Sequence, residues 1–504
     1  MPRLHWIFPA LAAVLLGGPL RAFPFEGRVT DGRRGLEGCR VYADRLHRPP
    51  GLAAATASAL TDGHGRFRLE LQAGDAVLAV EKEGWTRDLA PLAAFREGLV
   101  LRPAADYRIE RALVVRFERA RGEVRVDEGL LRRRLFSREP NVSSVANYLY
   151  EVSKGALSLE EGGWHRMPPS REFPQLRDAL RTRLVNRALG ELRDRDLSGL
   201  DRVNNATGAL SPDGKPDHLW VFAPGPARAV TSDSRHLTPL CFLMPLPWKP
   251  SVTWPVVLAT EESPIGLLVH EAFHAMGEHR ADDLYLDCDH PMTAGLWDLM
   301  DAGQYLGWEA PEPAASGWMD GIGASPSQPG PWVRADLWYR GRFRDSVNLR
   351  ELEGRAWEGW LDPLERAPGA ELQALRVPDP RREGTFWELS LRRPWGFDGG
   401  RIGDRHGPGT QGLIVARVDP SLLSERQPLG PVHVVDAHPG TALPLKPRLP
   451  CGRHELDDAA FNLGPGENPR GSEGALSWEV LASDGLGRMK VRVRLAPPPT
   501  TEVP

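Results

Sequence analysis

Two histidines and a glutamate near the middle of the chain carry the clearest chemical signal in the sequence. They lie in a run of five residues, from His270 to His274, that reads His-Glu-Ala-Phe-His. On a helix, residues four apart lie on one face, so both imidazoles can reach the same tetrahedral zinc ion. Glu271 can take the proton of a zinc-bound water as that water attacks a carbonyl carbon. The pattern predicts a zinc hydrolase with His270 and His274 as ligands and Glu271 as the catalytic general base.

A helix that carries this run has to begin and end close to it. Pro264, followed by an apolar stretch, suits the first position of a helix. Gly277 suits a helix end, and a stop at this point lets the chain fold back toward the metal. Buried strands are expected before this helix at residues 219–223 and 256–259. Helices mixed with strands ahead of the motif indicate an α+β enzyme domain.

Further elements follow from periodicity alone. The alternation at 109–117 predicts a strand. A helix is expected from Val145 to Gly155, capped by Asn141 or Ser143, and a second helix at 175–192. Strands are also expected at 386–391, 413–416 and 489–495.

Several segments resemble the immune-inhibitor-A-like secreted bacterial metalloproteases, which are metzincin-like zinc peptidases. The run at His270 resembles their H-E-x-G-H-x-x-G-x-P-D-x-Y-D motif, and residues 297–303 resemble their W-x-x-M-x-x-G turn. Residues 144–157 resemble the helix S-V-x-x-Y-x-x-E-V-S-x-G-x-L, and residues 393–398 resemble R-x-x-G-F-D. The resemblance implies a metzincin-like catalytic domain with a zinc cofactor, and it places Met300 in a turn beneath the metal.

The loop after the helix departs from the family pattern. The family's third ligand falls ten residues after the first histidine, where this chain has Arg280. Asp-Leu-Tyr occurs three residues later, so a short insertion would make Asp283 the third ligand, with His279 and Asp282 as the alternatives. A carboxylate is an ordinary zinc ligand. Phe273 stands where the family usually has glycine.

β-rich segments flank the motif on both sides. Residues 23–103 alternate in short strands between turns and resemble the carboxypeptidase-regulatory-like β-sandwich. With 504 residues the chain is long enough for several domains. We therefore expect a multidomain protein with an α+β zincin/metzincin-like catalytic domain at 106–320, an N-terminal β-sandwich at 23–103, a β-rich C-terminal domain at 325–496 and a disordered tail at 497–504. Whether 23–103 is a pro-segment is left open by the sequence.

The first 22 residues have the layout of a signal peptide. Arg3 and His5 precede an apolar stretch, which ends before the small residue Ala22. This predicts secretion, to the extracellular space or the periplasm, and no membrane association after cleavage. The chain has 63 Lys and Arg against 67 Asp and Glu and no long basic run, which argues against nucleic acid as a partner. The expected partners are protein or peptide substrates, and the sequence does not indicate an oligomeric state.

A cluster of acidic and amide residues lies between a predicted helix and a predicted strand. Oxygen ligands at close spacing suit Ca²⁺, so a calcium loop is one interpretation and a solvated polar loop is the other. The residues concerned are Asp194, Asp196, Asp201, Asn204, Asp213 and Asp217.

The four cysteines are widely spaced and form no CxxC pair, which argues against a zinc ribbon or a redox pair. Secretion would permit disulfides. Cys241 and Cys288 flank the motif and are the best candidate pair, free buried thiols are the alternative, and the pairing of all four, including Cys39 and Cys451, is left open.

The sequence thus predicts a secreted zinc-dependent endopeptidase that hydrolyses peptide bonds. One alternative is a degenerate peptidase that acts as a secreted binding or adhesion module, because the loop at 278–283 is altered. Another is a different zinc hydrolase, such as an exopeptidase or an amidase, which a requirement for an unblocked substrate terminus would reveal.

Overall fold

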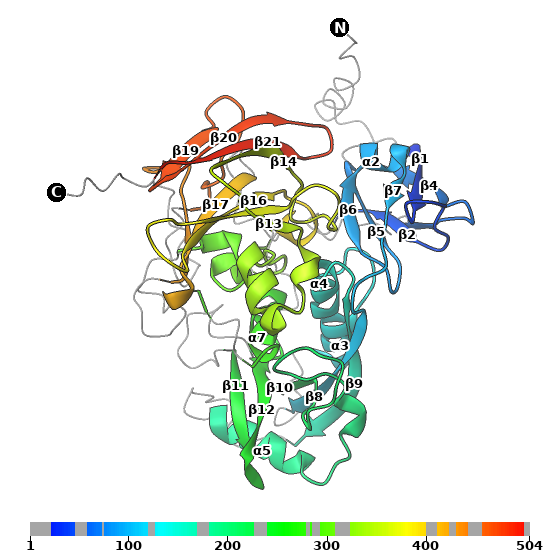
Figure 1. Ribbon diagram of the computed structural model, residues 1–504. Helices are drawn as coiled ribbons and strands as arrows, with labels where there is room; N and C mark the ends of the chain where they lie inside the picture. Colours follow the sequence, from blue (N-terminus) through cyan, green and yellow to red (C-terminus); the bar gives the residue numbers. More distant parts are fainter. Residues whose placement is uncertain are drawn as a thin grey trace, which may run out of the picture.

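Five β-sheets and a few helices make up the part of the chain that the structure describes, so the protein is an α+β, β-rich protein (Figure 1). The structure is a computed structural model. It describes residues 22–45, 58–72, 75–118, 126–168, 181–225, 239–278, 283–284, 293–307, 323–399, 411–422, 430–441 and 456–497. The expected signal peptide, apart from Ala22, and nearly all of the expected C-terminal tail lie outside these residues.

The N-terminal β unit, residues 22–103, consists of two sheets that share one apolar core. Phe25 and Leu69 come from one sheet, Val41 and Val80 come from the other, and all four are buried. The strand orders are β4-β1-β7 and β3-β2-β5-β6. A short helix that the sequence analysis did not expect adds Phe95 to this core. The elements are β1 (Phe23–Thr30), β2 (Arg40–Ala43), β3 (Ser58–Leu60), β4 (Arg66–Leu71), β5 (Val77–Glu81), β6 (Asp88–Pro91), α2 (Leu92–Glu97) and β7 (Leu99–Val100).

The middle of the chain forms a five-stranded sheet in the order β11-β12-β10-β8-β9. Four strands are parallel, and β11 runs antiparallel to β12 at the edge. Both faces are covered, because Trp220 and Phe222 of β10 face one apolar core and Leu219 and Val221 face another. The elements are β8 (Arg108–Phe117), α3 (Glu128–Phe136), α4 (Val145–Val152), β9 (Leu157–Met167), α5 (Arg181–Leu192), β10 (His218–Ala223), β11 (Leu240–Leu246), β12 (Lys249–Thr260) and α7 (Ile265–Ala275).

The predicted strands at 109–117, 219–223 and 256–259 are confirmed as β8, β10 and part of β12. The predicted helix after Val145 is also present, but its cap was assigned wrongly. The hydroxyl of Ser144 accepts the N–H of Asn147 at 3.0 Å. Ser143 instead bonds to the carbonyl of Ala324, and the Asn141 side chain is bonded to the N-terminal β unit. The helix expected at 175–192 is described only from Arg181 onward.

The C-terminal region again consists of two sheets around one core. Leu389 and Val415 belong to the sheet ordered β13-β15-β16-β17-β18, and Trp478 and Val491 belong to the sheet ordered β14-β21-β20-β19. The strands predicted at 386–391, 413–416 and 489–495 are confirmed. The strands are β13 (Leu349–Glu351), β14 (Ala356–Leu361), β15 (Ala374–Pro378), β16 (Phe386–Arg392), β17 (Gly412–Val418), β18 (Val432–Val434), β19 (Arg470–Glu473), β20 (Leu476–Ser483) and β21 (Met489–Leu495).

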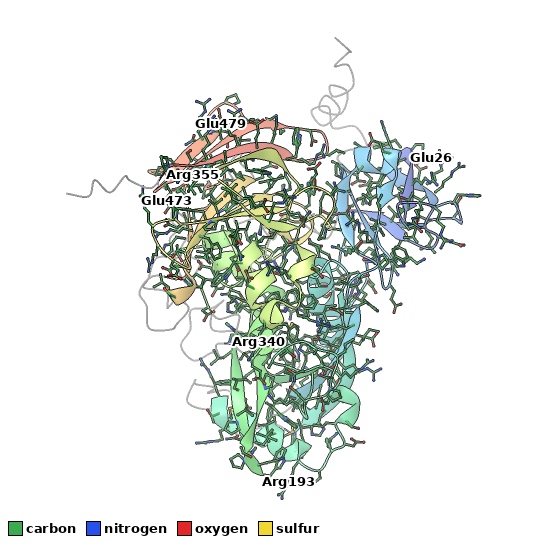
Figure 2. All side chains as sticks on the ribbon, viewed as in Figure 1. Glu26, Arg193, Arg340, Arg355, Glu473 and Glu479 are labelled. Atoms are coloured by element: carbon green, nitrogen blue, oxygen red, sulfur yellow. The ribbon has the colours of Figure 1, made fainter. Side chains whose placement is uncertain are left out.

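Short helical turns connect these parts. In Figure 1 the N-terminal β unit lies beside the C-terminal sheets and above α4, while α7 lies near the centre. Side chains occupy the space between the parts, and exposed residues such as Glu26 and Arg193 lie at the periphery (Figure 2). No described helix has the length and apolar character needed to cross a membrane. The turns are η2 (Ser198–Leu200), η3 (Gly295–Trp297), η4 (Ala302–Tyr305), η5 (Val333–Leu337), η6 (Trp338–Gly341), η7 (Arg344–Ser346), η8 (Gly396–Gly399) and η10 (Pro420–Leu422).

Candidate metal centre

Helix α7 positions the first two predicted ligands. Every residue from Ile265 to Ala275 is buried, so the helix is held on all sides by the core. The sequence analysis placed Pro264 at the first position of the helix. In the structure Pro264 is one residue earlier, at the N-cap position. The helix ends before Gly277, whose φ of 101° is a conformation that glycine adopts without strain. The chain therefore turns away directly after the motif, as predicted.

The structure brings His270, His274 and Asp283 together. The Nε2 atoms of the two imidazoles are 3.1 Å apart. Oδ1 of Asp283 lies 2.9 Å from Nε2 of His270 and 3.3 Å from Nε2 of His274. The other two candidates for the third ligand, His279 and Asp282, lie outside the described residues. Two nitrogens and one carboxylate oxygen therefore converge on a single point, where they could hold one metal ion.

The surroundings of this group suit a zinc ion. Nδ1 of His270 lies 3.1 Å from the carbonyl oxygen of Leu299, which can only accept a hydrogen bond. Nδ1 therefore donates to this carbonyl, which leaves Nε2 facing His274 and Asp283, where it would give its lone pair to a bound metal ion. Burial raises the pKa of Asp283, but the charge of His274 and the hydrogen bonds from both histidines lower it below its usual value overall. Asp283 is thus an ionised carboxylate, the form that binds a cation.

Glu271 lies between the two histidines in sequence and is also buried. Its Oε2 atom has no hydrogen-bond partner among the described residues. Burial raises the pKa of its carboxyl group, while His270, His274 and the backbone of Cys241 on β11 oppose the rise. A buried carboxylate with a raised pKa and an available oxygen is suited to accept a proton.

The segment around Met300 contacts both sides of the centre. Leu299 provides the carbonyl that orients His270, and the carbonyl of Met300 accepts the N–H of Leu284 at 3.0 Å. Leu284 directly follows Asp283, so the turn supports one histidine and the third ligand together. Met300 itself is fully buried in the core that contains α7.

Two aspartates hold this turn, and the sequence analysis did not assign them a role. Asp298 accepts the N–H of Met300 at 2.8 Å and that of Gly330 at 2.6 Å, and Asp301 accepts two further N–H groups, from Ala294 and Gly295. Burial raises the pKa of Asp298 to about 6 and that of Asp301 to about 7. The signal was present in the sequence, since acidic residues flank Met300 two positions before it and one position after it.

A tyrosine near the centre was also missed. The side chain of Tyr305 is buried, and burial together with the charges of Asp283 and Glu271 raises its pKa above the usual value. The phenol therefore remains a hydrogen-bond donor at neutral pH. Its position five residues after Met300 carries no sequence signal of its own.

Phe273 departs from the family pattern because the core needs its ring. The side chain is fully buried and stacks on Trp338, with ring centroids 4.5 Å apart. On another side it meets the edge of Tyr148 from α4 at 6.4 Å. Phe273 thus anchors α7 to two neighbouring elements.

The predicted calcium loop has no converging ligand set. Within the described residues, no three of its acidic side chains bring their oxygens together. The carboxylates accept backbone N–H groups instead. Asp201 bonds to residues 213 and 214, Asp213 bonds to Asn205, and Asp217 bonds to residues 202 and 203, whereas Asp194 and Asp196 are exposed. These bonds fit the alternative interpretation, a hydrogen-bonded polar loop.

Of the four cysteines, Cys39 and Cys241 are described, and both are buried free thiols. Cys288 and Cys451 lie outside the described residues, and so does the predicted pairing of Cys241 with Cys288. Burial raises the pKa of both described thiols. Neither is therefore a reactive thiolate at neutral pH.

A second group of possible ligands lies in the C-terminal region. Asp436, His438 and Asp458 are half-buried and bring one ligand atom each together. The N–H of His438 donates to Asp436 at 2.8 Å, and Nδ1 of His438 donates to the carbonyl of Asp458 at 2.6 Å. These hydrogen bonds join two segments of the chain, and this structural role accounts for the three side chains lying close together.

No protein-family model matches this chain, and no curated protein sequence matches it. The resemblance to the immune-inhibitor-A-like metalloproteases therefore depends on the motifs in the sequence alone.

Proposed function

We propose that the chain is a secreted zinc-dependent endopeptidase with a zincin/metzincin-like catalytic domain. The observation that carries this proposal is the convergence of His270, His274 and Asp283 beside the buried carboxylate of Glu271. Three protein ligands with a carboxylate next to them are what a catalytic zinc site requires, because a structural site would use four protein ligands.

The ligands and their neighbours have separate roles. His270, His274 and Asp283 would hold the zinc ion, and the carbonyl of Leu299 keeps the His270 ring in the correct tautomer. When bound, zinc supplies a Lewis acid that makes a water molecule more acidic and polarises a carbonyl group. Glu271 takes the proton from the attacking water and passes it to the leaving amine. Burial around Glu271 helps because the raised pKa brings the carboxylate closer to neutral operating pH.

An extended peptide is the substrate that the surroundings favour. Strand β11 stands at the edge of the five-stranded sheet, and its Cys241 backbone contacts Glu271. A peptide that added itself to this edge by main-chain hydrogen bonds would run past the catalytic carboxylate. Such binding needs no free substrate terminus, which is why an endopeptidase is favoured over an exopeptidase.

The test is casein hydrolysis by purified wild type and by Glu271→Gln, with the zinc content of both proteins measured by mass spectrometry. Wild type should bind one zinc per chain and cleave casein. Glu271→Gln should bind the same zinc, because the ligands are intact, and should lose about 10²- to 10⁴-fold in rate. Glu26→Gln, which changes an exposed glutamate, is the matched control and should behave like wild type.

Two results would overturn the proposal. Wild type that holds no zinc would leave the binding-module alternative as the better one. Wild type that binds zinc and cleaves only substrates with an unblocked terminus would indicate an exopeptidase.

A further inference from the structure

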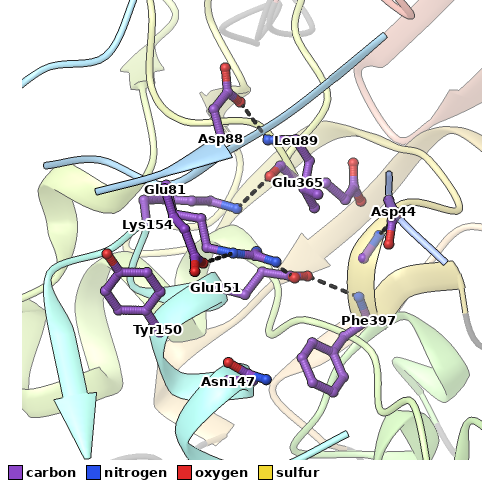
Figure 3. Close-up of polar contacts among 12 residues, drawn as sticks. Asp44, Glu81, Asp88, Leu89, Asn147, Tyr150, Glu151, Lys154, Glu365 and Phe397 are labelled. Atoms are coloured by element: carbon purple, nitrogen blue, oxygen red, sulfur yellow. Dashed lines mark hydrogen bonds and ion pairs between the residues drawn. The ribbon is translucent and has the colours of Figure 1, made fainter. Parts of the chain in front are cut away.

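A single buried carboxylate joins three parts of the chain (Figure 3). Glu151 lies on α4, and its Oε2 atom is 2.5 Å from Nη1 of Arg87 in the N-terminal β unit. Its Oε1 atom accepts the N–H of Phe397 at 2.9 Å and the side-chain amide of Gln328 at 3.2 Å. Glu151 is 1% exposed, so this contact is part of the interior. We call the contacts among these three parts the Glu151 junction.

The N-terminal β unit also bonds directly to the C-terminal region. The N–H of Gly396 donates to Asp44 at 2.8 Å. Asp88, which is 2% exposed, accepts the N–H of Ala367 at 2.8 Å and an N–H of the Arg366 guanidinium at 3.1 Å. Two carboxylates of the unit are thus hydrogen-bonded to groups that lie far along the chain, and the carboxylate of Asp88 is also paired with a positive charge.

Backbone contacts continue the same interface onto the catalytic part. The N–H of Arg87 donates to the carbonyl of Lys154 at 3.0 Å. The side chain of Asn141 pairs with a backbone segment of the unit, accepting from Arg45 at 2.9 Å and donating to Ala43 at 3.0 Å. One main-chain bond and a side-chain amide that bonds to two backbone groups need a fixed register, which a loosely attached segment would not keep.

The approach at Glu151 is close enough to require glycine. Gly396 has a φ of 57°, and a Cβ atom at this position would overlap the Glu151 carboxylate. An adjacent apolar contact places Trp395 against buried residues of the N-terminal β unit, including Tyr42 and Leu89. The surfaces are therefore complementary in shape as well as in charge.

The junction continues to the metal-binding helix. Tyr148, one turn before Glu151 on α4, packs edge-on against Phe397 at 5.1 Å and against Phe273 at 6.4 Å. Phe273 lies on α7 directly before His274. Arg87 is thus connected to a zinc ligand through Glu151, one turn of α4 and one aromatic contact.

We propose that the N-terminal β unit is a permanent part of the catalytic body, which the Glu151 junction holds against α4, and that it positions the metal-binding helix. A pro-segment has to leave without unfolding the enzyme. Removal of this unit would take Arg87 from Glu151 and Asp88 from Arg366 and would expose the apolar surface of Trp395 that packs on the unit, and these losses together would destabilise the remaining chain. The carboxylate beside the two histidines belongs to Asp283, which lies in the catalytic part of the chain. The N-terminal β unit therefore does not occupy this position.

The first experiment determines the N-terminus of the active, secreted protein by sequencing and intact mass. The active species is identified by its peptidase activity, so this experiment rests on the proposed function. The expected active species begins near residue 23 and retains the whole unit. An active species that begins after residue 103 would overturn the proposal, because the unit would then be a pro-segment.

The second experiment compares full-length Arg87→Met with Arg34→Met. Arg34 is the matched control, because it is an exposed arginine of the same unit whose ion pair among the described residues is a local one with Asp31. Arg87→Met should lower the melting temperature and weaken zinc binding by about 2- to 30-fold, the range for substitutions that couple to a site without touching it. Zinc affinity is measured by chelator competition well below the melting transition, and Arg34→Met should leave both quantities unchanged.

Arg87→Lys keeps the positive charge and should recover part of both losses. Zinc affinity at the wild-type level in Arg87→Met would overturn the positioning role, even with a lowered melting temperature. If wild type bound no zinc, the proposed function would fail, whereas the N-terminus of the secreted protein and the melting temperatures would still test the junction.

Discussion

Glu151 and Glu271 are both buried glutamates on neighbouring helices, and they differ in how their oxygens are used. Burial raises the pKa of each carboxyl group. Both oxygens of Glu151 are occupied, one by Arg87 and the other by two N–H donors. One oxygen of Glu271 has no hydrogen-bond partner among the described residues.

The difference separates a structural carboxylate from a chemical one. Buried polar groups in folded proteins nearly always find partners, so each exception needs a reason. At Glu151 the charge is compensated, and the group fixes three segments of chain. At Glu271 one oxygen lies beside two imidazoles and Asp283 and is available. On the proposed function, the attacking water molecule would be its hydrogen-bond partner. The same residue type therefore stabilises one region and leaves the other prepared for proton transfer.

The largest expected effect comes from replacing each glutamate by glutamine. Glu151→Gln removes the nearer of the two carboxylates that pair with Arg87 and leaves Glu81 at 3.6 Å, so it should cost about 3 kcal/mol of stability, the lower end for breaking a buried pair. Glu271→Gln removes a buried charge that lacks a full set of partners, so its stability should equal or exceed that of wild type. Thermal melting of the metal-free proteins measures both effects.

Casein hydrolysis should rank the two variants in the opposite order to stability. Below both melting transitions and at a zinc concentration that saturates both proteins, Glu151→Gln should retain most of its casein hydrolysis, and Glu271→Gln should have lost it. A common fall in melting temperature for the two variants would break the comparison, because Glu271 would then be a structural group like Glu151.

The second prediction sharpens the contrast at the third ligand. Asp283→Ala removes the oxygen that lies beside both Nε2 atoms. Zinc affinity should fall by more than the roughly 10- to 100-fold that loss of an outer-shell partner costs. Competition with a chromophoric chelator provides the measurement. The variants His279→Ala and Asp282→Ala serve as controls and should bind zinc normally, and a larger loss in either one would move the third ligand to that residue.

The convergence of the candidate metal ligands could be predicted from the sequence because most of the group is local. His270, Glu271 and His274 lie within one helical turn, and Asp283 follows nine residues later. The spacing of the first three residues indicates that they share one helical turn, whereas Asp283 was predicted from the resemblance to the metalloprotease motif, with His279 and Asp282 as alternatives. The Glu151 junction could not be predicted in this way. Its bonds join residues 64, 177 and 246 positions apart, and nothing in the local pattern pairs them.

The same contrast between local and long-range information applies to the fold. Strands such as β8 and β16 were predicted because their alternating or apolar patterns need only local information. Helix α3 was missed because three consecutive arginines at 132–134 obscure its apolar face, although Asp127 caps it. Strand β11 was missed because its proline and its exposed Leu243 interrupt the pattern of an edge strand. Which sheets pack together depends on contacts between distant segments, and the sequence alone does not specify them.

The smallest expected effect concerns a third buried carboxylate, Asp362, which lies close to Arg366 and Asp88 at the edge of the junction. Its Oδ1 atom also has no partner among the described residues. Burial raises its pKa to about 6, although Arg366 opposes the rise. In the unfolded chain an aspartate titrates near pH 4, to within about a unit. The folded protein thus holds this proton more tightly, so the contribution of Asp362 to stability is full below about pH 4 and declines as the pH rises to about 6.

Asp362→Asn is neutral at every pH and should remove this decline. Its melting temperature relative to wild type should increase between pH 4.5 and pH 7, and thermal melting of both proteins at these two values tests the sign. A constant difference would mean that Asp362 is ionised throughout and that its unpartnered oxygen has no effect on its protonation. The expected increase in the melting-temperature difference would show that burial of a carboxyl group with an unpartnered oxygen raises its pKa and does no more than that. The role of Glu271 would then depend on the histidines and Asp283 beside it, not on burial alone.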